Sequence, residues 1–174
     1  MPPVSELIIR PATLADLPEI NRVYNDEILH GVATWDEAAW NDARRAEWFA
    51  EHDELTPILV AESAGRFAGF SYLSYCSAKS GWRFSREDTI YLDREFRGQG
   101  IGDLLLGALL VRAGELGINH IVASIESSNV GSLRLHSKHG FEVIGTQRQA
   151  GFKFGRWLDT TLMQRVLRDG AAES

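Results

Sequence analysis

The sequence predicts a single mixed α/β domain whose front half is mostly antiparallel. Runs rich in β-branched and aromatic residues alternate with amphipathic segments in the order β-α-α-β-β-β-α-β-α-β-β. The chain has 174 residues, 44% of them hydrophobic and 24% charged, which suits one domain with a substantial core. We therefore expect one domain over residues 1–174, with a flexible tail at 167–174.

The first half of the chain is predicted to begin with a strand and two helices. Leu7–Arg10 forms a short strand that Pro11 ends. Thr13 is expected to cap a helix over about 14–29, and Gly31 follows its end. A second helix is predicted over about 36–51, and Trp35, just before it, is a candidate for lining a pocket or for packing in the core.

Outside the stretch Ser85–Leu116, the rest of the chain is predicted to form a hairpin, a buried strand, a short helix and two final strands. Pro57–Glu62 and Phe67–Leu73 flank the turn at 63–66 and form a hairpin. Near the end, Ile118–Ile125 has the near-continuous apolar character of a buried strand. The remaining elements are a short helix capped by Ser128 or Asn129 and ending at Gly140, and final strands at Phe141–Gly145 and Leu158–Leu167.

The most informative stretch is Ser85–Leu116, which is predicted to be a strand, a glycine-rich turn and a helix. Thr89–Leu92 is β-branched and aromatic, the turn is Arg97–Gly102, and apolar residues recur from Ile101 at helical spacing. Glycines let a ligand approach the backbone closely, and the free N–H groups of the first helical turn attract anions. The arginine adds a fixed positive charge, so this turn is predicted to bind phosphate. A glycine-rich turn without a ligand is the alternative.

The overall charge limits the classes of partner. The net charge is −6, with 18 basic and 24 acidic residues, which argues against a broad surface for nucleic acid or anionic membrane. Cys76 is the single cysteine, which excludes an internal disulfide and suits a reducing compartment. The N-terminal residues contain no apolar signal-peptide core, so the cytoplasm is the expected location.

Two common phosphate motifs do not fit the turn. The dinucleotide pattern G-x-G-x-x-G would need glycine at Asp103, and the Walker pattern would need lysine at Ala108. The pattern R/Q-x-x-G-x-G does fit, and Arg97-Gly98-Gln99-Gly100-Ile101-Gly102 resembles the pyrophosphate loop of the GNAT acyl-CoA N-acyltransferases. The predicted order of strands and helices is also that of the GNAT fold, so the resemblance implies a mixed, mostly antiparallel central sheet flanked by helices.

Further segments are similar to one branch of that family, the phosphinothricin and methionine sulfone–methionine sulfoximine N-acetyltransferases. They are Tyr24–Asp26, Glu87–Tyr91, Ser127–His136 and Lys153–Asp159. The resemblance implies acetyl-CoA as cofactor, a small amine substrate, a homodimer with Phe152–Asp159 in or near its interface, and a role in detoxification. It implies these cofactor-binding residues: Thr89, Ile90, Tyr91, Leu92, Arg97, Gly98, Gln99, Gly100, Ile101, Gly102, Asp103, Asn129 and Ser132.

Two residues are candidates for proton transfer. Glu87 matches the family's glutamate and is the candidate base for removing the proton of the amine; a solvated or arginine-paired glutamate is the alternative. His136 stands where many GNATs have a tyrosine acid, and a histidine titrates near neutrality. A structural histidine, hydrogen-bonded on its helix, is the alternative for His136.

Substrate recognition is predicted around the start of the same strand. An arginine fork binds a carboxylate in bidentate fashion, so Arg83 is the first candidate, assisted by Arg86 or Lys79. The further candidates are Glu87, Asp88, Cys76, Ser77 and Ala78. Arg86 and the segment 76–78 depart from the residues usual in the branch, so the side-chain pocket is expected to differ.

The resulting hypothesis is acetylation of the α-amine of a small amino-acid analogue such as L-methionine sulfoximine, L-methionine sulfone or phosphinothricin, by direct transfer. The alternatives are a GNAT that acts on a protein N-terminus or an antibiotic, and a non-catalytic acyl-CoA sensor. Cys76 has no neighbouring histidine–carboxylate pair in sequence to activate it as a nucleophile. His136 and His139 alone are weak evidence for a metal site, and none is predicted.

Overall fold

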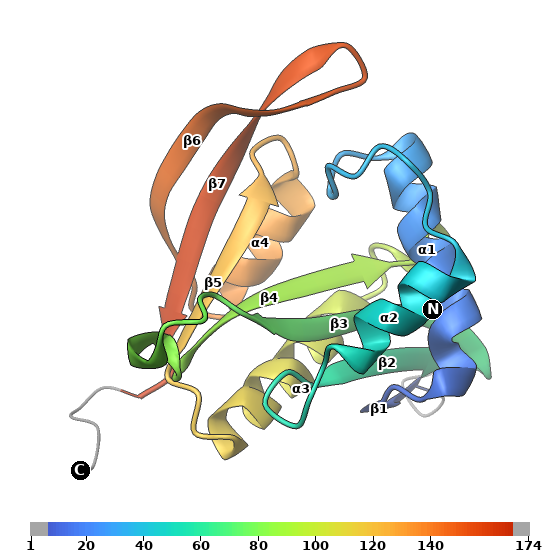
Figure 1. The fold of residues 1–174 in the computed structure, drawn as a ribbon, viewed down its shortest axis with the longest axis horizontal. Helices are drawn as coiled ribbons and strands as arrows, with labels where there is room; N and C mark the ends of the chain where they lie inside the picture. Colours follow the sequence, from blue (N-terminus) through green and yellow to red (C-terminus); the bar gives the residue numbers. More distant parts are fainter. Residues whose placement is uncertain (1–6, 169–174) are drawn as a thin grey trace.

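The computed structural model describes residues 7–168, which form one seven-stranded sheet with helices on both faces (Figure 1). The strand order is β1-β2-β3-β4-β5-β7-β6. The strands are β1 (Leu7–Pro11), β2 (Ile58–Ser63), β3 (Arg66–Tyr75), β4 (Ser85–Leu92), β5 (His120–Glu126), β6 (Glu142–Lys153) and β7 (Arg156–Val166). The helices are α1 (Leu17–His30), α2 (Asp42–Ala50), α3 (Ile101–Glu115) and α4 (Val130–Lys138).

This architecture confirms the predicted mixed, mostly antiparallel sheet and the predicted order of elements. Every neighbouring pair of strands is antiparallel except β4 and β5. That parallel pair is short, because only Ser85–Glu87 pairs with His120–Val122. Beyond these residues the two strands diverge, and in Figure 1 β5 rises steeply away from β4.

The two faces of the sheet have separate cores. On one face, α1 and α2 cover a cluster that includes Ile20, Val60 and Phe70, and Tyr91 packs against it. On the other face, α3 and α4 cover a larger cluster that includes Leu105 and Ile121. Alternate residues of β4 point to opposite faces. Glu87, Thr89 and Tyr91 therefore face α1, whereas Arg86, Asp88, Ile90 and Leu92 face α3 and α4.

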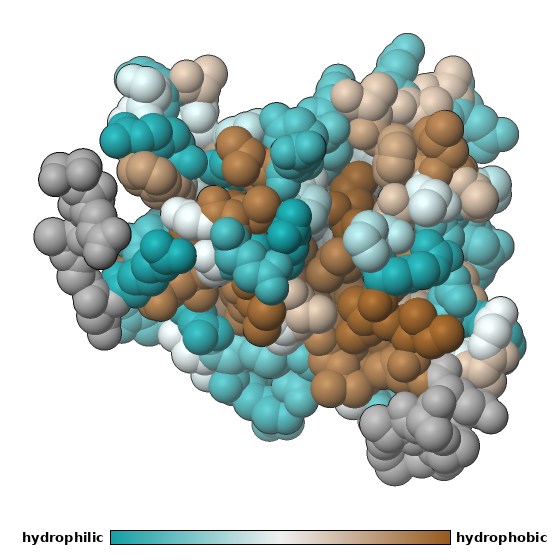
Figure 2. Space-filling model, turned by 90° about the horizontal axis from the view of Figure 1, so that it is seen from below, coloured by the Kyte–Doolittle hydropathy of each residue, from teal (hydrophilic) through white to brown (hydrophobic). Residues whose placement is uncertain are grey.

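Helix α3 lies along the lower side of the sheet in Figure 1 and is apolar on much of its circumference. Its inner side chains Leu105, Leu106 and Leu109 are fully buried, while Leu104 and Val111 are exposed. The face seen from below in Figure 2 accordingly shows apolar areas between hydrophilic side chains. The apolar residues of this helix thus extend beyond the side that packs on the sheet and onto its exposed side.

The second predicted helix is shorter than expected. It was predicted over 36–51, but α2 begins at Asp42 because Asn41 caps it, accepting a hydrogen bond from Arg44 N at 2.9 Å. Asp36 instead accepts hydrogen bonds from the Tyr24 hydroxyl and from Trp40 Nε1. These contacts hold residues 36–41 in an irregular segment above α1.

The last two strands are much longer than expected. The predictions were 141–145 and 158–167, whereas β6 and β7 form a hairpin over Glu142–Val166. Most of β6 is exposed on both faces, so its sequence lacks the apolar alternation that signals a strand. In Figure 1 this hairpin extends well beyond the rest of the sheet.

The described C-terminal end of the chain packs against the loop before β5. The expected tail begins at 167, but Leu167 N donates to Asn119 O at 2.7 Å and Arg168 N donates to Asn119 Oδ1 at 3.1 Å. Residues 167 and 168 are therefore bound to the loop before β5. The rest of the expected tail lies outside the described residues.

Candidate active site

The divergence of β4 and β5 opens a pocket of about 400 Å³ through the sheet. β4 supplies Glu87–Tyr91, β5 supplies Ala123–Glu126, and Ala33–Trp35 contributes from the segment after α1. The remaining lining residues are Asn129, Ser132, His136, Gln147 and Thr160. We call this the strand pocket. Because Asp88–Leu92 have no partner strand on the β5 side, the backbone groups that point there are free to bind a ligand.

A second pocket, of about 390 Å³, lies beside the predicted phosphate turn, and we call it the loop pocket. Its lining includes Arg97, Gly98, Gly100, Gly102 and Asp103. It shares Ala33, Ile90, Tyr91, Asn129 and Ser132 with the strand pocket. The shared lining places the two pockets next to each other.

The glycine turn has the backbone geometry that an anion site needs. Gly98 and Gly100 have positive φ angles of 73° and 81°, which favour glycine, and Gly100 is the N-cap of α3. Gly102 packs closely, since a Cβ atom there would lie 3.2 Å from Leu92 Cδ1. The first-turn N–H groups of a fifteen-residue helix therefore open toward the loop pocket.

Glu87 lies at the point where β4 and β5 separate. It is half-buried and is the last β4 residue paired with β5, opposite Val122. Its neighbours include Cys76, and burial, with a contribution from the Glu87 charge, raises the pKa of the Cys76 thiol. The thiol is therefore disfavoured as a nucleophile, which agrees with the expectation from the sequence.

Asp88 and His136 form a buried pair on the opposite face of β4. His136 Nε2 lies 3.0 Å from Asp88 Oδ2, and His136 Nδ1 lies 2.8 Å from the carbonyl oxygen of Ser132. The Asp88 side chain is 0% exposed and the His136 side chain is 2% exposed. Burial alone would lower the pKa of His136, but the hydrogen bond and charge of Asp88 outweigh it and raise the pKa above its usual value.

The long hairpin closes over the segment that follows α1. A Cβ atom at Gly151 would lie 2.4 Å from the Trp35 ring, so only glycine leaves room for this tryptophan. Lys153 Nζ donates hydrogen bonds of 2.8 Å to Gly31 O and Thr34 O, and the lysine is 1% exposed. Burial lowers the pKa of Lys153.

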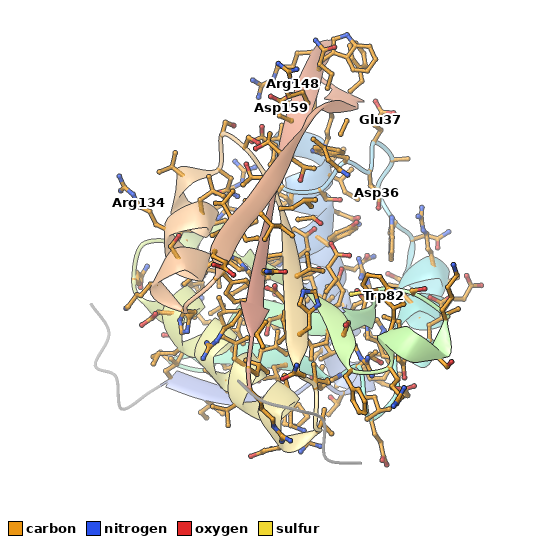
Figure 3. The ribbon with its side chains drawn as sticks, turned by 90° about the vertical axis from the view of Figure 1, so that its left-hand side faces the viewer. Asp36, Glu37, Trp82, Arg134, Arg148 and Asp159 are labelled. Carbon is orange, nitrogen blue, oxygen red and sulfur yellow. The ribbon has the colours of Figure 1, made fainter. Side chains whose placement is uncertain are left out.

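Figure 3 shows the two sides of this closure. Asp36 and Glu37 lie on the segment after α1, across from Arg148 and Asp159 on the hairpin. The hairpin is braced locally, because Gln149 N donates to Asp159 Oδ1 at 2.7 Å. The hairpin thus fixes the position of Trp35. This tryptophan lines the strand pocket, which was one of the two roles that the sequence allowed for it.

The structure separates the two arginines predicted to bind substrate. Arg83 is exposed, stacks on the Phe84 ring at 4.5 Å, and makes one long hydrogen bond, 3.4 Å, to Ser80 O. Arg86 is 1% exposed and donates to the carbonyl oxygens of Leu55, Arg83 and Ser85. Its position on the far face of β4 removes Arg86 from the candidate substrate site.

The other predicted residues are distributed as follows. Asp88 lines the strand pocket, but its carboxylate belongs to the buried pair with His136. The segment Cys76–Ala78 follows β3 and lies outside the lining of both pockets. Of the predicted cofactor residues, Gln99 and Ile101 line neither pocket: Gln99 Nε2 donates to Glu95 O, and Ile101 is buried in the core.

Several pocket residues were missed by sequence reasoning. They are Glu27, Ala33, Thr34, Ala123, Ser124, Ile125, Glu126, Gly131, Leu135, Gln147 and Thr160. Ala33 and Thr34 belong to a polar connection without a motif, and Gln147 lies in the part of β6 that was not predicted. Glu27 follows the Tyr24–Asp26 segment directly, which was the one available signal.

Within residues 7–168, no cluster of three possible metal ligands occurs. None of the helices in this range combines the length and apolar character needed to cross a membrane.

Comparisons with known proteins agree with this geometry. Residues 6–142 match the family model of the acetyltransferase (GNAT) domain. The chain is 42% identical over 158 residues to an L-methionine sulfoximine/L-methionine sulfone acetyltransferase of Pseudomonas paraeruginosa, covering 90% of this chain and 92% of the relative.

Two solved structures are similar over nearly the whole chain. The yncA protein of Salmonella typhimurium, solved with its cofactor acetyl-CoA, has a TM-score of 0.91 and 36% identity, covering 96% of this chain and 97% of that one. A phosphinothricin acetyltransferase of Sinorhizobium meliloti, in complex with acetyl-CoA, has a TM-score of 0.91 and 38% identity, covering 97% and 92%. The chain therefore belongs to the GNAT family of N-acetyltransferases.

Proposed function

We propose that the protein transfers the acetyl group of acetyl-CoA to the α-amine of a small amino-acid analogue such as L-methionine sulfoximine, L-methionine sulfone or phosphinothricin. The observation that carries this proposal is the adjacency of the two pockets across the gap between β4 and β5. One pocket offers an anion site for a diphosphate, and the other presents Glu87. The relatives named above act on such analogues, which supports the choice of substrate class.

The residues of the loop pocket fit the cofactor. Backbone N–H groups of the turn Gly98–Gly102 and the Arg97 guanidinium would hold the diphosphate. The free backbone groups of Asp88–Leu92 would pair with the pantetheine arm and bind the carbonyl oxygen as negative charge develops on it. Acetyl-CoA supplies the acetyl group as a thioester.

The strand pocket suits an amine. Its lining includes the carboxylates of Glu87 and Glu126 and contains no lysine or arginine among the described residues, so it attracts an ammonium group. Glu87 would accept the ammonium proton at its carboxylate, directly or through a water molecule, which frees the nitrogen lone pair for attack. The new C–N bond would form as the C–S bond breaks, and the sulfur, leaving with the electron pair, would take up the second proton that the nitrogen loses.

Recognition of the substrate carboxylate is assigned to Arg83, which lies outside the lining of both pockets but only four residues before Glu87. The only hydrogen bond of its side chain among the described residues is the long one to Ser80 O, so the guanidinium is available for a bidentate contact. The buried Arg86 is not available in this way.

The homodimer and the cytoplasmic location remain part of the proposal. The hairpin exposes Phe152, Phe154 and Trp157 by 51%, 55% and 61%, an apolar surface that a second copy of the chain would cover. A detoxifying role would follow from the substrate class.

Release of free thiol from acetyl-CoA, measured against a panel of amines, tests the proposed function. The panel contains L-methionine sulfoximine, L-methionine sulfone, phosphinothricin, L-methionine, a short peptide and an aminoglycoside. Selective turnover of the first three is expected. Turnover only of the peptide or aminoglycoside would overturn the substrate class, and tight cofactor binding without any turnover would indicate a sensor.

A further inference from the structure

The loop pocket contains a buried carboxylate at the place where an anion is expected. Glu27, in the last part of α1, has a side chain that is 6% exposed and lines this pocket. Its Oε2 accepts a hydrogen bond of 3.0 Å from Arg97 Nη2, and its Oε1 accepts one of 3.0 Å from Ala33 N. Both carboxylate oxygens of Glu27 thus accept a hydrogen bond from the protein.

The backbone nearby is shaped around this carboxylate. A Cβ atom at Gly31 would lie 1.7 Å from Glu27 Oε1. The φ angle of Gly31 is −127°, which any residue adopts, so backbone conformation does not require glycine there. The glycine is needed because it leaves room for the Glu27 side chain.

The charges of the loop pocket make Glu27 important for ligand binding. Arg97 is the one lysine or arginine in the described lining, whereas Glu27 and Asp103 are both acidic. Asp103 has other partners, since it lies 2.8 Å from Lys138 Nζ and 2.9 Å from His139 Nε2. The Arg97 charge is therefore offset by Glu27 before any anion arrives.

The donors of Arg97 are also partly occupied. Nε and Nη2 both donate to Leu92 O at 3.2 Å, and Nη2 donates to Glu27 as well. Within residues 7–168, Nη1 is the guanidinium nitrogen without a hydrogen bond. A phosphate can approach Nη1 freely, but a bidentate contact along the Nη1–Nη2 edge has to displace the Glu27 carboxylate.

We propose that Glu27 competes with the diphosphate of coenzyme A for Arg97 and thereby weakens cofactor binding. The inference rests on the proposed function, because it requires coenzyme A in the loop pocket. The same carboxylate holds Ala33, which lines both pockets, so Glu27 is a positioning residue between the cofactor loop and the wall of the strand pocket. When the ion pair between Glu27 and Arg97 forms again, it favours release of coenzyme A after transfer.

Calorimetric titration with coenzyme A and with pantetheine, which lacks the diphosphate, tests this proposal. Glu27→Gln keeps an acceptor for Ala33 N but removes the charge. We expect it to lower the Kd of coenzyme A about fivefold at low salt, as for one partly exposed ion pair, and to leave the Kd of pantetheine unchanged. The gain should shrink at high salt and in an Arg97→Gln background.

Two further variants complete the experiment. Glu19→Gln, on the same helix and paired with Arg22 at the surface, is the matched control and should leave both affinities unchanged. Gly31→Ala pushes the carboxylate aside without removing it and should also tighten coenzyme A binding. An unchanged or raised Kd for coenzyme A in folded Glu27→Gln, or an equal change for pantetheine, would overturn the proposal. Folded wild-type protein that binds no coenzyme A would instead overturn the proposed function, and this inference with it.

Discussion

His136 Nε2 and Asp88 Oδ2 lie 3.0 Å apart inside the protein, and this distance requires a shared proton. His136 Nδ1 faces the carbonyl oxygen of Ser132 at 2.8 Å, and a carbonyl only accepts, so Nδ1 carries a hydrogen. A neutral imidazole would then present a bare Nε2 to the carboxylate. The geometry therefore favours an imidazolium that donates from Nε2 to the carboxylate of Asp88, in keeping with the raised pKa of His136.

This arrangement favours a structural role for His136 over direct proton donation to a ligand. Both ring nitrogens have protein partners, and the side chain is 2% exposed. His136 still lies in the lining of the strand pocket, through α4, so the pair fixes the position of that helix against β4. The catalytic role of His136 stays a prediction.

Asp88→Asn should destabilise the protein more at pH 6 than at pH 9. The folded pKa of His136 is raised, so the stabilisation from the pair is complete below the unfolded pKa, about 6.5, and is lost as the pH rises through the folded value. Breaking a buried pair costs roughly 3 kcal/mol at the lower pH. Urea unfolding at both pH values measures the difference, and an equal loss at both would contradict the assignment of the proton.

Glu87→Gln should lower kcat at pH 7 by about a hundredfold or more, because the amide cannot accept the ammonium proton. The deficit should narrow as the pH is raised, since more of the substrate amine is then already deprotonated. Steady-state rates between pH 7 and pH 9.5 measure this. Glu37→Gln, an exposed change outside the pocket lining, is the control, and a wild-type kcat for Glu87→Gln at pH 7 would refute the base.

Gly151→Ala should raise the KM for the amine several-fold while the affinity for coenzyme A stays the same. Its Cβ atom would meet the Trp35 ring at 2.4 Å, and Trp35 lines the strand pocket but not the loop pocket. Such overpacking costs about 1–3 kcal/mol, so Tm should also fall. Gly145→Ala, in the same hairpin with open space around its Cβ position, should change neither quantity. An unchanged amine KM in Gly151→Ala would show that Trp35 does not shape the site.

Arg83→Gln should raise the KM for an amino-acid substrate roughly 10- to 100-fold, the value of one charged hydrogen-bonded contact. An amine without a carboxylate should be unaffected. Arg148→Gln, an exposed change on the hairpin (Figure 3), serves as the control. Equal effects on both kinds of amine would mean that Arg83 does not recognise the carboxylate.

The sequence predicted the parts of this site that depend on local pattern. The glycine turn before α3 and the amphipathic spacing of that helix both follow from short-range rules. Ser128 or Asn129 was expected to cap α4, and the 3.1 Å hydrogen bond from Ser132 N to Asn129 Oδ1 shows that Asn129 does so. Glu87 was placed at the site by its match to the family's glutamate, and it lines the strand pocket.

The parts that were missed depend on contacts between distant segments. Arg86 is buried where it donates a hydrogen bond to the carbonyl oxygen of Leu55, thirty-one residues away. The sequence around Arg86 gives no sign of this contact. Lys153 ties the hairpin to the segment after α1 by a hydrogen bond to Gly31 O. The exposed strand β6 lacks the apolar alternation by which a strand is predicted. The Glu27–Arg97 ion pair likewise joins α1 to the phosphate turn across seventy residues.

The most direct test of the central claim is to incubate the protein with acetyl-CoA and L-methionine sulfoximine and to follow both thiol release and the mass spectrum of the product. We expect one thiol to be released for each molecule of product, with the acetyl group on the α-nitrogen. Thiol release that stays at the amine-free background, in folded protein that binds acetyl-CoA, would contradict it.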